Sequence, residues 1–126
     1  MMEDSKKKIL IIDDEVLIGE LVCDYLGTMG FDTFAARSAR EGLEMLKDKK
    51  PDLVLLDVLM PEMTGIECLK HIKKINRETI VIMVTAVHDE QTAKQAIGLG
   101  AYDYITKPID FNYLRGSIIA RIFPDA

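Results

Sequence analysis

The chain has 126 residues, of which 48% are apolar and 29% are charged, and its formal net charge at pH 7 is −5. This length suits one globular domain with one substantial core, so we expect a single domain over residues 1–126 with a loose N-terminus over about residues 1–7. The acidic balance argues against direct binding of nucleic acid, which requires concentrated lysine and arginine.

Strands and helices are predicted to alternate along the chain. Nearly unbroken apolar runs, typical of parallel strands covered on both faces, occupy residues 9–12, 53–56, 80–84 and 102–105, with a weaker edge strand at 33–36. Apolar residues at helical spacing predict helices around 17–26, 43–46, 66–75, 90–99 and 111–123. Glycines are expected where helices end, at Gly27, Gly30, Gly98 and Gly100. The pattern is five βα units, which predicts an α/β doubly wound parallel sheet.

The two cysteines, Cys23 and Cys68, do not form a CxxC pair and both fall in segments with helical spacing. We interpret them as reduced core or half-buried residues and expect no disulfide framework. The longest apolar runs are strand-sized, so we expect no export signal and no membrane span. The cytoplasm is the expected location.

Polar residues follow directly after four of the predicted strands: Asp13 and Asp14, Asp57, Thr85 and Lys107. The carboxyl ends of parallel strands share one edge of a doubly wound sheet, and ligands bind at that edge. Crowded carboxylates repel one another unless a cation lies among them, and oxygen ligands suit Mg²⁺. Each residue alone has an ordinary alternative as a helix cap, a turn residue or a surface charge. Those alternatives do not explain why three carboxylates, a hydroxyl and an ammonium group follow four different strands.

Five short blocks occur in a fixed order along the chain: Ile11-Ile12-Asp13-Asp14-Glu15, Leu56-Asp57-Val58-Leu59-Met60-Pro61, Gly65, Thr85-Ala86 and Lys107-Pro108. Their order and spacing resemble those of the receiver domains of bacterial two-component response regulators, over essentially the whole chain. The resemblance implies a flavodoxin-like fold with strand order 2-1-3-4-5. It also implies a signalling phosphoacceptor, not an enzyme that turns over a separate substrate.

The resemblance further implies that Asp57 accepts a phosphoryl group from the phosphohistidine of a sensor histidine kinase or a phosphotransfer protein. A carboxylate is a chemically reasonable nucleophile for this step. Mg²⁺ would be ligated by Asp14, Asp57 and the backbone carbonyl of Leu59, and Asp13 would act through a bound water.

Three further roles follow from the same resemblance. Lys107 would pair with one phosphoryl oxygen, and the Thr85 hydroxyl would move toward another. Tyr104 would then turn inward into the vacated space, as the aromatic switch residue. A cis peptide bond between Lys107 and Pro108 is also implied. The switch would control an output domain or a target protein, and homodimerisation stays open.

Three other functions fit the sequence less well. A phosphatase of the haloacid dehalogenase type also uses an aspartate nucleophile and Mg²⁺, but it needs an acid two residues later, where this chain has Leu59. A flavodoxin-like FMN carrier needs a phosphate-binding loop after the first strand, and Asp13-Asp14-Glu15 would repel phosphate. A receiver that serves as a constitutive interaction domain would not need the acceptor, the acid pair, the threonine and the lysine.

Overall fold

The computed structural model describes residues 6–125, and these form one parallel sheet of five strands with five helices. The strands are β1 (Lys8–Ile12), β2 (Asp32–Ala36), β3 (Leu53–Leu56), β4 (Ile80–Thr85) and β5 (Asp103–Thr106). The helices are α1 (Val16–Thr28), α2 (Ala39–Lys49), α3 (Gly65–Ile75), α4 (Glu90–Gly98) and α5 (Phe111–Ile122). Most of the segment expected to be loose, residues 1–5, lies outside the described residues.

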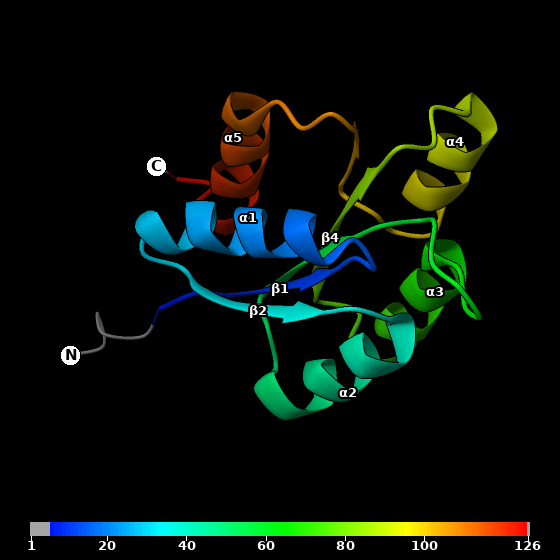
Figure 1. The fold of residues 1–126 in the computed structure, drawn as a ribbon, viewed down its shortest axis with the longest axis horizontal. Helices are drawn as coiled ribbons and strands as arrows, with labels where there is room; N and C mark the ends of the chain where they lie inside the picture. Colours follow the sequence, from blue (N-terminus) through cyan, green and yellow to red (C-terminus); the bar gives the residue numbers. More distant parts are fainter. Residues whose placement is uncertain (1–5, 126) are drawn as a thin grey trace.

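The strand order is β2-β1-β3-β4-β5, which confirms the expected doubly wound topology. Figure 1 shows α1 and α5 on one side of the sheet and α2 and α3 on the other. Helix α4 packs against α3 and β5. In the register of the central strands, Ile12 pairs with Leu56 and Leu56 pairs with Met83. The residues that follow these strands therefore lie along one rim.

The sheet separates two apolar cores. Leu10, Ile12 and their counterparts in β3 and β4 pack with the buried residues of α2, α3 and α4. Ile9 and Ile11 point to the opposite side and pack with Val22 of α1 and other buried residues of α1 and α5. Because successive side chains point to opposite faces and both faces are covered, every position of β1, β3 and β4 is buried except the first residues of β1 and β4, Lys8 and Ile80. This arrangement explains the unbroken apolar runs.

The expected element ends agree with the structure to within two residues, except that α2 extends over Ala39–Lys49, well beyond the expected 43–46. The strand expected at 102–105 is observed one residue later, and β4 extends to Thr85. The reason is that Thr85 pairs with Thr106, so the hydrogen-bonded ladder continues past the last apolar residue of each strand. Gly27 and Gly98 lie in the last turns of α1 and α4.

The two other glycines end these helices through their backbone conformation. Gly30 and Gly100 have φ angles of 94° and 110°, a region in which side chains are strained. The amide of Phe31 donates to Leu26 O, and the amide of Ala101 donates to Ala96 O in the same way. These are Schellman motifs, and they direct the chain from α1 and α4 back toward the sheet.

The cysteine prediction is confirmed. Both thiols are free, with Cys68 fully buried and Cys23 partly buried. Burial raises the pKa of the Cys68 thiol to about 12. Within residues 6–125, no helix is long and apolar enough to cross a membrane.

Two glycine-to-alanine substitutions should have opposite effects on stability. A Cβ at Gly42 of α2 would overlap the buried side chain of Ile12, whereas a Cβ at Gly116 of α5 would meet no atom within 4 Å. We expect Gly42→Ala to lower the free energy of unfolding by about 1–3 kcal/mol and Gly116→Ala to raise it by about 0.5–1 kcal/mol. Urea unfolding of both variants measures these changes. Equal effects would contradict the packing of α2 on β1.

Candidate functional site

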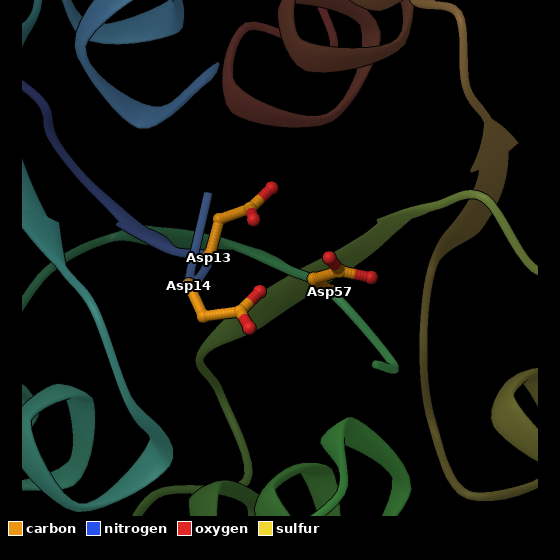
Figure 2. Close-up of side chains that lie close together, drawn as sticks. All are labelled: Asp13, Asp14 and Asp57. Atoms are coloured by element: carbon orange, nitrogen blue, oxygen red, sulfur yellow. The ribbon is translucent and has the colours of Figure 1, made fainter. Parts of the chain in front are cut away.

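Three carboxylates meet at the rim where β1 and β3 end. Asp13 and Asp14 follow β1, Asp57 follows β3, and one carboxylate oxygen from each lies within 4.8 Å of the others (Figure 2). Asp13 and Asp57 are 5% and 4% exposed, whereas Asp14 is exposed. The sequence prediction that these three residues converge is confirmed. We call them the acid cluster.

Backbone hydrogen bonds fix the two buried members of the acid cluster. The Asp57 amide donates to Ile12 O at 3.0 Å, which ties the residue after β3 to the end of β1. One carboxylate oxygen of Asp57 accepts from the Leu59 amide at 3.1 Å, and one of Asp13 accepts from the Glu15 amide at 2.9 Å. Each aspartate therefore holds the loop that follows it in place.

Gly65 allows the start of α3 to lie against the residue that follows β3. Its amide donates to Val58 O at 2.9 Å. A Cβ at this position would overlap the carbonyl oxygen of Asp57 and lie 2.7 Å from Val58 Cα. A glycine is therefore required here for steric reasons. Gly65 belongs to one of the five sequence blocks, but its steric role is visible only in the structure.

Lys107, which follows β5, provides the positive charge of the site. Its Nζ lies 2.8 Å from Asp13 Oδ2, 3.2 Å from Asp57 Oδ2 and 2.6 Å from Glu15 Oε1. The expected cis peptide bond between Lys107 and Pro108 is present. Sequence reasoning missed Glu15 as a partner, although it follows directly after the acid pair.

The pKa values of Asp13 and Lys107 are set by two opposing effects, which are their burial and their contacts with groups of opposite charge. Burial raises the pKa of Asp13, the hydrogen bond from Lys107 and the Glu15 amide lower it, and the charge of Asp57 raises it again, so the net direction is upward. Burial alone would lower the pKa of Lys107, but its hydrogen bonds to Asp13 and Glu15 and the charge of Asp57 raise it above its ordinary value. Lys107 therefore stays charged and offsets part of the repulsion among the carboxylates.

The acid cluster fits a hard divalent cation. All three side chains offer oxygen, and within the described part of the chain this is the one group of three or more acidic, histidine or cysteine side chains close enough to share an ion. Mg²⁺ binds to one or two carboxylates and keeps waters that phosphate oxygens can replace. A structural zinc site would instead use cysteine or histidine.

Thr85 and Tyr104 lie beside the acid cluster and meet at the backbone of Val87. Thr85 is fully buried at the end of β4, and its Oγ1 accepts from the Val87 amide at 3.3 Å. The Tyr104 hydroxyl donates to Val87 O at 2.8 Å, and its ring packs partly buried against the core on the α2–α4 side. The loop after β4 thus links the two residues that the sequence analysis assigned to a switch.

Comparison with known proteins decides the family. Residues 9–119 match the model of the response regulator receiver domain. The chain belongs to this family. Receiver domains are the parts of two-component response regulators that are phosphorylated on an aspartate, and they use Mg²⁺ at an acidic pocket. Neither the phosphatase nor the FMN carrier is favoured.

Individual relatives agree with this assignment. The transcriptional regulatory protein CrdR of Helicobacter pylori is 40% identical over 121 residues, which cover 95% of this chain and 56% of CrdR. This chain therefore spans little more than half the length of that relative. A CheY-like receiver domain protein of Methanospirillum hungatei superposes with a TM-score of 0.90 at 30% identity, covering 94% of both chains. A CheX–CheY–BeF₃–Mg²⁺ complex of Borrelia burgdorferi contains a chain with a TM-score of 0.88 at 29% identity, covering 92% of this chain and 89% of that one.

In the presence of a chelator, loss of the Lys107 charge and loss of the Asp57 charge should change the stability of the fold in opposite directions. Lys107→Met leaves the buried Asp13 without its cation, so we expect the free energy of unfolding to fall by as much as about 3 kcal/mol. Asp57→Asn removes one repelling charge beside Asp13, so we expect a higher melting temperature than in the wild type. Thermal and urea unfolding measure both effects. Lys94→Met, at an exposed position of α4, is the control, and a loss as large as that of Lys107→Met would contradict the assignment.

Proposed function

We propose that Asp57 is the phosphoacceptor of this receiver domain. The observation that carries the proposal is its position. Asp57 is, with Asp13, one of the two buried carboxylates that contact Lys107, and it is the one that follows β3, the central strand of the sheet. One carboxylate oxygen forms a bond to phosphorus while the bond from phosphorus to the donor's imidazole nitrogen breaks. The product is an aspartyl phosphate.

We further propose specific tasks for the neighbouring groups. Asp14, Asp57 and the backbone carbonyl of Leu59 would hold Mg²⁺, and Asp13 would act through a bound water. When bound there, Mg²⁺ would supply positive charge that offsets the charge of the phosphoryl oxygens. Lys107 already lies 3.2 Å from Asp57 and can move from the carboxylate to a phosphoryl oxygen. Phosphoryl transfer requires mainly positioning and charge neutralisation, so this set of groups is sufficient.

The proposed phosphodonor is a sensor histidine kinase or a phosphotransfer protein. Helix α1 begins just after the acid cluster, and it exposes Leu17 and Leu21, whose side chains are 80% and 53% exposed. Residues four apart lie on the same face of a helix, so the two leucines offer an apolar contact on the helix that follows Asp13 and Asp14. A partner that docks on them can place its phosphohistidine at the rim. We propose that this exchange takes place in the cytoplasm.

We propose that phosphorylation changes the face formed by α4, β5 and α5 and thereby controls an output domain or a target protein. Movement of Thr85 toward a phosphoryl oxygen would break its hydrogen bond with the Val87 amide. The carbonyl of the same residue accepts from Tyr104, so displacement of the loop also frees the tyrosine. Next to Tyr104, Asp103 accepts hydrogen bonds from Tyr113 and Ser117 of α5. The change can therefore extend from β5 to α5 as a shift between two states.

Acetyl phosphate with Mg²⁺ should add one phosphoryl group to the wild-type protein and none to Asp57→Ala. The reason is that a small phosphodonor needs no docking surface and depends on the acceptor and the ion alone. Intact-mass analysis followed by peptide mapping measures the modification.

The matched control for this experiment is Asp48→Ala, which removes an exposed aspartate of α2. This variant should be modified like the wild type, and a chelator should abolish the modification in both proteins. A phosphorylated Asp57→Ala protein, or labelling that chelator leaves unchanged, would refute the acceptor assignment.

Tyr104→Phe should favour the activated state. The substitution removes the hydroxyl that donates to Val87 O in this structure. Such a hydrogen bond contributes about 0.5–1.5 kcal/mol to the stability of the arrangement that contains it. We therefore expect the affinity for beryllofluoride with Mg²⁺, measured by calorimetry, to rise about two- to tenfold. Tyr25→Phe removes a comparable hydroxyl bonded to Phe111 O and should leave the affinity unchanged. Equal affinities for Tyr104→Phe and the wild type would show that this bond does not restrain the switch.

A further inference from the structure

A basic hollow lies at the edge of the sheet opposite the acid cluster. It has a volume of about 300 Å³ and is lined by residues from the end of α3, the start of β4, the turn before β5 and the end of α5. Its cations are Lys73, Arg77 and Arg121, and one carboxylate, Glu78, also lines it. We call it the Lys73–Arg121 hollow.

The positive charge extends into a second, adjoining hollow of about 260 Å³. This hollow shares Glu78 and Arg121 with the first and adds Lys7 and Lys50. Its other carboxylate, Asp52, is already engaged, because it accepts from the Lys8 amide at 2.8 Å. The surroundings are therefore basic in a chain whose formal net charge is −5.

The cations of the Lys73–Arg121 hollow have hydrogen-bond donors that are free to bind a ligand. Lys73 Nζ donates to Thr79 O at 2.7 Å and to Arg77 O at 3.3 Å, which fixes the ammonium and leaves one of its three hydrogens. The Arg121 guanidinium lies 5.2 Å from the centre of the Tyr102 ring, a cation–π contact. Within residues 6–125, no carboxylate oxygen lies within 4.0 Å of the charged nitrogens of Lys73, Arg77 or Arg121.

The backbone also makes room for Lys73. A Cβ at Gly100 would lie 3.1 Å from Lys73 Cε, so the lysine stem crosses the turn where Gly100 has no side chain.

Burial lowers the pKa of Lys73, and the charges of Arg121 and Arg77 lower it further, against the opposing effect of Glu78. The ammonium is thus held among like charges that an anion would neutralise.

We propose that the Lys73–Arg121 hollow binds a compact, multivalent anion of the phosphate class. Arginine and lysine recognise phosphate oxygens through charge-assisted hydrogen bonds. The volume is at the lower end of the range for small-molecule sites and far above the roughly 30 Å³ that one water occupies. A long polyanion is disfavoured because the rest of the chain is acidic and would repel it. The site is separate from Asp57, which follows the opposite ends of the strands.

Titration with inorganic pyrophosphate, followed by amide NMR, tests this proposal. The protein is kept in chelator without Mg²⁺ and at constant ionic strength, so that the acid cluster does not contribute through a metal. We expect saturable shifts of the amides at 77–79 and 100–102. The Lys73→Gln, Arg121→Gln double variant should bind at least about tenfold more weakly, which corresponds to roughly 1.4 kcal/mol.

The matched control is the Lys94→Gln, Arg115→Gln double variant, which loses the same charge elsewhere and should bind like the wild type. Modification of both double variants by acetyl phosphate verifies that they fold. Equal weakening in the two double variants, or shifts confined to the residues around Lys107, would overturn the proposal. Tighter binding of a hexaglutamate peptide than of pyrophosphate would overturn the assignment to a compact phosphate-class anion.

Discussion

The contact of Lys107 with the carboxylates at the rim is the interaction on which the rest of the site depends. One ammonium contacts Asp13 after β1, Glu15 before α1 and Asp57 after β3. Without it, two nearly buried carboxylates would lie close together at the end of an apolar sheet, and no positive side chain would offset their desolvation cost. A single cation from the last βα unit therefore holds together residues that come from the first and third units.

The proposed phosphorylation of Asp57 would act on these same contacts. A phosphoryl group on Asp57 would place new negative charge where Lys107 already lies, so the lysine can exchange one oxygen partner for another at little cost. The neighbouring loop is linked differently, because the backbone of Val87 holds both Thr85 and Tyr104 by one hydrogen bond each. Each of these hydrogen bonds contributes only about 1 kcal/mol. A few new contacts to a phosphoryl group would therefore be sufficient to shift the equilibrium between the two proposed states.

The two ends of the strands have opposite electrostatic character. The carboxyl ends carry the acid cluster, which attracts cations, whereas the Lys73–Arg121 hollow lies near the other end, where β4 and β5 begin. Helix α5 extends from one end to the other, because Arg121 lies in its last turn and Tyr113, in its first turn, donates a hydrogen bond to Asp103, the residue before Tyr104. An anion in the hollow would therefore contact the same helix that the proposed output face uses.

The sequence alone determined the five βα units and the convergence of Asp13, Asp14 and Asp57, because continuous apolar runs report two-sided burial and parallel strands end at one edge. The strand order was implied by family resemblance, since local periodicity does not record which strands pair. Other features depended on tertiary structure. The contact between Glu15 and Lys107 and the meeting of Thr85 with Tyr104 at Val87 join segments far apart in the chain. The cations of the Lys73–Arg121 hollow likewise come from α3, the loop after it and α5. Such contacts arise when helices and strands pack, and no spacing within one segment encodes them.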